Sequence, residues 1–226
     1  MRYLFFLTLT IFLFSSCSED SDKESISASE NIDKANQEVS AIDQQTYDLV
    51  TAGAENVIVS YEQLLNKMLA TDISKEEREL LVKQSIYNGQ QSQATYIFDN
   101  PNVIIEDDIS PDFYTSSKIK DLKVSRYLKD LYLFLDRDNN TSVSFENIKT
   151  LQIKEGEEVF VIVYFESIIN GKHSLESFPY QKTKRIATIK AEQKNKKWDY
   201  SIMSIGFYEL TEVKNDSRPV RTLKKA

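Results

Sequence analysis

The sequence predicts an α+β domain in which N-terminal helices pack on a curved, mostly antiparallel sheet. Early in the chain, apolar residues recur at three- and four-residue steps, which is typical of amphipathic helices. The second half alternates apolar and polar residues or is continuously apolar, and turn dipeptides such as Asn170-Gly171 separate these runs. The hydrophobic fraction is 41% of 226 residues, which is enough for one buried core.

Two helices are expected first. Residues 42–70 carry an apolar stripe, although Gly53 either weakens this helix locally or marks a close contact, because glycine costs about 1 kcal/mol relative to alanine inside a helix. A second helix is expected after Ser74, which forms a capping box with Glu77. Asn88-Gly89 is expected to end it, since glycine reaches the left-handed conformation without a steric clash.

Strands dominate the rest of the predicted domain. Short strands are expected at 94–98 and 103–106 and a third helix at 117–135, followed by four antiparallel strands at 142–153, 158–169, 181–192 and 198–208. The strand at 158–169 is apolar on both faces, so we expect it at the centre of the sheet with both faces covered. The next strand places Ala187, Ile189 and Ala191 on one face.

This order of elements resembles the nuclear-transport-factor-2-like (cystatin-like, SnoaL-like) superfamily. The matching features are the hairpin at 94–106, the helix at 117–135 that leads into the meander, and the last strand, Trp198–Tyr208. The resemblance implies a cone-shaped roll whose helices pack into the concave face of a bent sheet; the long first helix departs from it. The superfamily contains both enzymes and non-catalytic binding or dimerisation modules, so the fold assigns no function.

The N-terminus predicts export and lipid anchoring. The apolar run Leu4–Phe14 has 11 residues, whereas a membrane-spanning helix needs roughly 20, so residues 1–16 fit a cleaved signal peptide. Phe14-Ser15-Ser16 before Cys17, the only cysteine, resembles the lipobox of bacterial lipoproteins, with Phe and Ser in place of the commoner Leu and Gly or Ala. The resemblance implies a palmitate-type anchor of two or three acyl chains on Cys17. The alternative is an ordinary secretory signal.

Polar segments flank the expected domain. Residues 17–40 are predicted to be an acidic flexible tether and residues 211–226 a basic C-terminal tail, which leaves 41–210 as the α+β domain. Ser18–Asp22 resembles the signal that sends lipoproteins of some Gram-negative bacteria to the outer face of the outer membrane. We therefore expect an outer-membrane lipoprotein that faces the cell surface, and a periplasm-facing anchor is the alternative.

Composition excludes several function classes. The net charge of −7 argues against nucleic-acid partners, and one Cys with one His argues against disulfide frameworks, Cys-rich zinc sites and multi-His metal sites. Asp136–Asn147 resembles a calcium-binding loop, but Thr141 and Asn147 replace its required Gly and Glu, so we interpret it as a polar loop. His173 is expected in an exposed hairpin loop. No metal or cofactor is predicted.

Candidate ligand-binding residues come from the superfamily resemblance. In its members similar to ketosteroid isomerases and polyketide cyclases, an Asp in the mouth of the cone acts as acid or base, often beside a Tyr. Asp107 or Asp108 with Tyr61 or Tyr96 could form this pairing, but no spacing rule supports the choice, and a solvated strand end is the simpler explanation of the two carboxylates. The aromatic residues of the meander are expected in the core, on a dimer face or, as an alternative, stacked on sugars.

The sequence thus predicts an envelope lipoprotein with a non-enzymatic binding or dimerisation module and no catalytic residue. Its expected partners are the membrane, through the lipid anchor, and a small molecule, a glycan, an envelope protein or a second copy of the chain. A cone-fold enzyme of the isomerase, cyclase or hydrolase kind, with an Asp–Tyr pair in an enclosed pocket, is the alternative.

Overall fold

A computed structural model describes residues 43–89, 96–110, 119–136, 140–156, 158–175 and 179–208. The predicted signal peptide, the tether and the basic tail lie outside the described residues. Within the described ranges, no helix is long and apolar enough to cross a membrane.

The described elements form an α+β domain, as predicted. In chain order they are α2 (Gln44–Leu69), α3 (Lys75–Ser85), β1 (Ile104–Glu106), β2 (Asp121–Lys123), α4 (Val124–Phe134), β3 (Ser142–Lys154), β4 (Val159–Asn170), β5 (Thr183–Lys194) and β6 (Lys197–Phe207). The six strands make one mixed sheet in the order β2-β1-β6-β5-β4-β3. Only the β1–β6 pair is parallel, and the sheet is not closed, because β2 and β3 lie at its edges.

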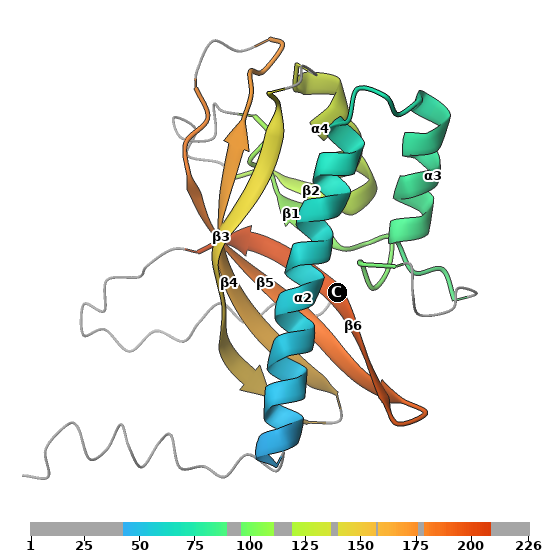
Figure 1. Cartoon of the computed structure of the whole chain (residues 1–226), viewed down its shortest axis with the longest axis vertical. Helices are drawn as coiled ribbons and strands as arrows, with labels where there is room; N and C mark the ends of the chain where they lie inside the picture. The colour runs from blue at the N-terminus through green and yellow to red at the C-terminus, as the bar shows by residue number, and fades with distance from the viewer. Residues whose placement is uncertain are drawn as a thin grey trace, which may run out of the picture. The chain divides into compact units, whose positions relative to one another are not determined.

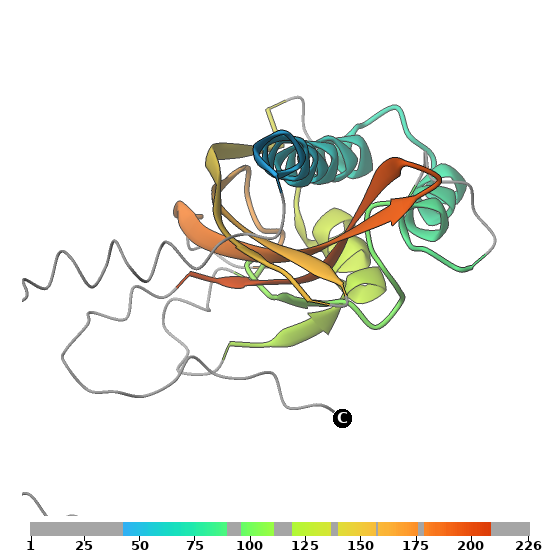
Figure 2. The same cartoon turned by 90° about the horizontal axis from the view of Figure 1, so that it is seen from below.

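Irregularities in β3 and β6 contribute to the twist of the sheet. The pairing register of β3 shifts after Glu146 and again after Thr150, and that of β5 with β6 shifts after Thr188. Asn147, within the first of these shifts, has a left-handed φ of 53°. Such bulges bend a strand and increase its local twist. Helix α2 lies across one face of the twisted sheet (Figures 1 and 2).

Helix α2 agrees with the predicted helix at 42–70. The Asp43 side chain caps it by accepting a hydrogen bond from the Thr46 amide at 3.0 Å. Its apolar stripe, which includes Val50, Ile58 and Leu65, is buried against the sheet and α4. Amphipathic burial of this kind, rather than intrinsic propensity, supplies most of a helix's stability in a protein.

Helix α3 begins with the predicted capping box. Ser74 accepts from the Glu77 amide at 3.2 Å, and the Glu77 carboxylate accepts from the Ser74 amide at 2.8 Å. The buried side chain of Arg78 donates to the Met68 carbonyl at 2.7 Å and also to the Ala70 carbonyl. The guanidinium therefore satisfies carbonyls at the C-terminal end of α2 and ties α3 to it.

The predicted hairpin at 94–106 is wrong. Phe98 is buried and forms only single parallel bridges, one with Ile86 and one with Ile202. The antiparallel partner of β1 is instead β2, which occupies the first part of the helix predicted at 117–135, so α4 starts at Val124. An edge strand of three residues has too little periodicity to be recognised from sequence, because its pairing is decided by a distant strand.

The strand predicted at 158–169 exists as β4, but it is not the centre of the sheet. It lies between β5 and the edge strand β3. Val161, Val163 and Phe165 are buried on the helix-covered face, whereas Phe160 and Ile162 on the other face are only half-buried. The sequence placed this strand at the centre because it is apolar on both faces, but half-buried apolar residues next to an edge strand give the same pattern.

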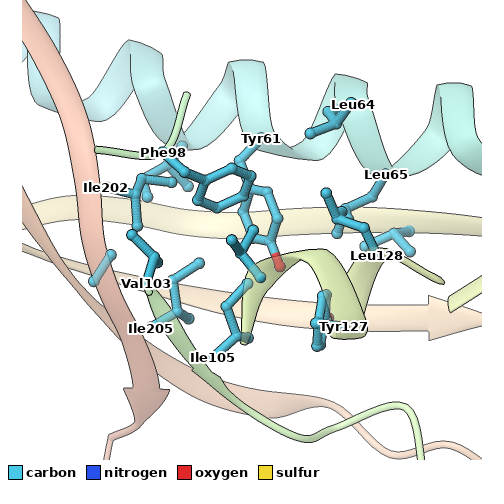
Figure 3. Close-up of a cluster of buried hydrophobic side chains, with 14 of the residues drawn as sticks. Tyr61, Leu64, Leu65, Phe98, Val103, Ile105, Tyr127, Leu128, Ile202 and Ile205 are labelled. Atoms are coloured by element: carbon cyan, nitrogen blue, oxygen red, sulfur yellow. The ribbon is translucent and has the colours of Figure 1, made fainter. Parts of the chain in front are cut away.

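The core fills the space between α2, α4 and the sheet. Tyr61 projects from α2 into its centre, with Phe98 on one side and α4 with Tyr127 on the other (Figure 3). Its ring meets that of Phe98 edge-on with centroids 5.6 Å apart and that of Phe145 at 5.3 Å. Edge-on and tilted pairs at such distances are the favoured aromatic geometries.

Candidate functional site

The four candidate residues from the sequence lie in three different places. Tyr61 and Asp108 belong to a polar network inside the core, and they are 1% and 3% exposed. Tyr96 lines a cavity between α2 and β6, and Asp107 lines a second cavity beside α4. The structure therefore brings Tyr61 near Asp108 and separates Tyr96 from Asp107.

A buried ion pair is the centre of the core network. Asp108 Oδ2 lies 3.2 Å from Arg185 Nη1, and Asp108 Oδ1 accepts from the Tyr127 hydroxyl at 2.8 Å. Arg185 Nη2 donates to the Glu106 carbonyl at 2.7 Å, and its guanidinium lies 4.4 Å from the centre of the Phe207 ring. Each charge has its counter-charge, which is what permits ionised groups at this depth.

The two tyrosines of this network are held in the neutral form. Burial, followed by the nearby Asp108 carboxylate, raises the pKa of Tyr61 and raises that of Tyr127 well above its ordinary value. The Tyr61 hydroxyl is hydrogen-bonded to Tyr127, which completes a chain from α2 through α4 to β5. All four side chains are buried, so the network joins α2, α4 and β5 inside the domain.

Arg185 and Tyr127 belong to this network but were not among the candidate residues from the sequence. Arg185 is the charged one of the two. It shares the alternating face of β5 with Ala187, Ile189 and Ala191, and all four are buried. A charged residue at a position that alternates with buried apolar residues on one strand face indicates a buried ion pair. Its partner, Asp108, lies 77 positions earlier in the chain, and no pattern in the sequence indicates that these two residues meet.

We use the name α2–β6 cavity for a hollow of about 550 Å³ between helix α2, the segment at 96–97 and the start of β6. The helix contributes polar side chains of Ser60, Gln63 and Lys67, and all three are exposed. Opposite them, Tyr96, Trp198 and Tyr200 provide aromatic rings, and Asp199 adds a carboxylate. Its volume lies within the range of small-molecule sites.

Local packing fixes two of these rings. The Tyr200 hydroxyl donates to the Leu49 carbonyl at 3.0 Å, and the ring occupies the space that a Cβ on Gly53 would need. The glycine in the middle of α2 is thus explained as a close contact, one of the two readings of the sequence. The Tyr96 ring packs on that of Tyr87 with centroids 4.8 Å apart. Burial, followed by the Asp199 carboxylate, raises the pKa of Tyr200 to about 12.

The second hollow, about 510 Å³, is named the α4 cavity. Its lining includes Asp107, Arg126, Asp130, Phe134 and His173. His173 is 9% exposed, so the prediction of an exposed hairpin loop is wrong. Its ring stacks on Phe134 with centroids 5.3 Å apart, and its Nδ1 accepts from the Leu175 amide at 3.1 Å. The loop folds back onto α4, because His173 pairs through its backbone with Leu135.

The acidic side chains of the α4 cavity have hydrogen-bond partners within the domain. Asp107 Oδ1 accepts from the amides of Ile109 at 3.0 Å and Ser110 at 3.3 Å. Burial nevertheless raises the pKa of Asp107, because loss of water disfavours the carboxylate more than the two amides favour it. Arg126 Nε bonds Asp130 at 2.8 Å one helical turn away.

Metal-ligating side chains do not gather in the part of the chain that the structure describes. There, no group of three His, Cys, Asp or Glu side chains is placed to share an ion. The calcium-like loop is described only in part, since 137–139 lie outside the described residues, and its second half forms the start of β3.

No protein-family model, no curated protein and no solved structure matches this chain.

Proposed function

We propose that this protein is a lipid-anchored lipoprotein of the bacterial outer membrane, and that its domain is a non-enzymatic binding module whose ligand occupies the α2–β6 cavity. The anchor rests on the signal sequence and the lone Cys17. The binding role rests on the lining of the cavity, with fixed aromatic rings opposite exposed polar side chains of α2. Rings that are already positioned lose little entropy when a ligand arrives, which favours binding.

The same proposal takes the domain as a cone-shaped roll of the nuclear-transport-factor-2-like kind. Support comes from the order of helices and strands, from a twisted open sheet with α2 on one face, and from α4 preceding the four long strands. In this reading the α2–β6 cavity opens between the long helix and the sheet.

Trp198 permits a direct test, because it is the only tryptophan of the chain and lines this cavity. We expect a low-molecular-weight extract of the native envelope to shift the Trp198 emission and to reduce quenching by acrylamide. The measurement uses the full mature chain in a zwitterionic detergent, with an extract passed through a small-pore filter. Unchanged quenching in the presence of the extract would contradict a binding role for this cavity.

One observation favours the alternative, an enzyme that uses a carboxylate as acid or base. Asp107 lines the α4 cavity with a raised pKa, and the Tyr180 hydroxyl, which bonds the Ile109 carbonyl at 2.5 Å, lies close to it. A desolvated carboxylate is a strong base toward a proton on carbon. We expect such a site to accelerate the base-promoted ring opening of 5-nitrobenzisoxazole, and Asp107→Asn to remove the acceleration. Equal rates for both proteins would eliminate this alternative.

A further inference from the structure

We infer that the α2–β6 cavity binds a saccharide, with a pyranose ring packed on the aromatic wall and its hydroxyls bonded to the helix. This inference rests on the proposed function and names its ligand class. The cavity has two chemically different walls, and this difference carries the argument. The segment at 96–97 and the start of β6 contribute three aromatic rings, Tyr96, Trp198 and Tyr200, together with Ile97 and Asp199. Helix α2 contributes the polar Ser60, Gln63 and Lys67 together with the apolar Val57 and Leu64.

The polar side chains of the helical wall form a regular row. Positions 60, 63 and 67 are three and four residues apart, so their side chains share one face of α2. Gln63 both donates and accepts, Lys67 donates, and the Ser60 hydroxyl, which donates to the Asn56 carbonyl at 2.9 Å, still has lone pairs that accept. A ligand with several hydroxyl groups along one edge could bond to all three side chains, because each hydroxyl both donates and accepts.

The aromatic wall is pre-formed. Tyr200 is held by Leu49 and by the space above Gly53, Tyr96 rests on Tyr87, and Trp198 packs against the hydrophobic core. The C–H face of a pyranose ring is apolar and slightly positive, so it packs well on the negative face of an aromatic ring. Because these side chains are already held in place, a ligand that binds to them costs little side-chain entropy.

Charge and polarity favour a neutral ligand rich in hydroxyl groups over a simple ion or an acyl chain. Lys67 and Asp199 bring one charge of each sign to the lining, which gives no preference for an anion or a cation. An acyl chain would leave the polar groups of α2 without partners at a cost of about 1–3 kcal/mol for each group that is buried unpaired. The volume of about 550 Å³ is suited to a short oligosaccharide segment.

An envelope protein can meet pyranose rings of two kinds: the amino sugars of the bacterial cell wall and neutral glucans outside the cell. The test therefore has two arms, N,N′,N″-triacetylchitotriose and maltotriose, titrated into the full mature chain. A zwitterionic detergent is required, since maltoside and glucoside detergents carry sugar rings themselves. Binding is measured by calorimetry and by the emission of Trp198.

We expect at least one of the two saccharides to bind and to protect Trp198 from acrylamide. Tyr96→Ala and Gln63→Ala should each weaken binding at least tenfold, whereas Trp198→Phe should keep most of the calorimetric signal and lose the fluorescence. Tyr47→Ala is the matched control, because Tyr47 is a half-exposed tyrosine of α2 outside the cavity lining, and binding should be unchanged. Circular dichroism confirms that each variant is folded.

The outcomes separate this inference from the proposed function. If the envelope extract protects Trp198 but neither saccharide binds, the saccharide class is wrong and the binding role stands. If neither the extract nor the saccharides act on Trp198, both proposals fail. Binding of a saccharide that survives Tyr96→Ala and Gln63→Ala unchanged would place it elsewhere and overturn the inference.

Discussion

At the scale of single residues, Gly53 and Arg185 are unfavourable in their local element, and each is explained by a contact with a distant residue. Gly53 leaves room for the Tyr200 ring against α2, and Arg185 occupies a position on an otherwise apolar strand face. In both cases a residue that is locally unfavourable is compensated by a partner far away in the sequence. Substitutions at these positions therefore test tertiary contacts rather than helix or strand propensity.

Gly53→Ala should destabilise the protein although alanine is the better helix former. Intrinsic propensity favours alanine by about 1 kcal/mol, but its Cβ would overlap the Tyr200 ring, and overpacking of this kind costs about 1–3 kcal/mol. We expect a lower free energy of unfolding in urea. In a Tyr200→Ala background the same change should instead raise it, and stabilisation of the wild-type background by Gly53→Ala would contradict the contact.

Arg185→Met should lower the free energy of unfolding by about 3–5 kcal/mol, because it leaves the Asp108 carboxylate buried without its counter-charge. The double variant Arg185→Met/Asp108→Asn should lose less than Arg185→Met alone, since the amide carries no charge and still accepts from Tyr127. Urea denaturation of the single and double variants measures this coupling. Additive losses would show that the pair does not act as a unit.

At the scale of elements, β3, β4 and the start of β5 are joined on the outer face of the sheet through Glu166. Its carboxylate accepts from Lys182 at 3.0 Å, Asn147 at 2.9 Å and Tyr164 at 2.9 Å. These donors, the Lys182 ammonium first, lower the pKa of Glu166 to about 2. The left-handed Asn147 in the bulge of β3 is thereby brought into contact with β4.

Because the folded-state pKa of Glu166 lies below its unfolded value of 4.5, the ionised group stabilises the fold at pH above 4.5. This contribution should be lost as the pH falls from about 4.5 to about 2. Glu166→Gln should therefore lower the free energy of unfolding clearly at pH 7 and much less near pH 3. Glu79→Gln, at an exposed position of α3, is the control, and a pH-independent effect of Glu166→Gln would argue against this linkage.

At the scale of the whole molecule, the proposed function joins an N-terminal anchor to a domain with a ligand cavity. Each buried methylene of an acyl chain contributes about 0.8 kcal/mol, so two or three chains hold a protein at a membrane stably. The anchor is thus expected to depend on one atom, the Cys17 sulfur, and to be independent of the domain's fold.

Cys17→Ala should abolish acylation and move the protein out of the membrane fraction. The measurement is mass spectrometry of the mature N-terminus together with cell fractionation. Arg185→Met is the matched control: it perturbs the domain and should leave acylation intact. An unmodified N-terminus in the wild type, or membrane attachment that survives Cys17→Ala, would refute the lipid anchor. Digestion of intact cells with protease would distinguish the surface-facing from the periplasm-facing orientation.

The elements with long, regular patterns could be predicted from the sequence. The stripe of α2, the capping box of α3 and the four long strands β3 to β6 each follow from local periodicity and turn chemistry, so their positions agree with the structure to within a few residues. Short elements could not be placed. The segment around Phe98, which forms only single bridges, and the unrecognised β2 have too few residues for a period to be visible.

The sequence by itself determined the helices, the long strands, the α+β class and the expectation of a lipid anchor, because all of these depend on residues close together in the chain. The tertiary structure decided which side chains meet. It closed Asp108 and Tyr61 into a core network with Arg185, buried His173 against Phe134, and gathered Tyr96, Trp198 and Gln63 around one cavity. Such contacts join positions tens of residues apart, and no local pattern encodes which distant partner a side chain will find.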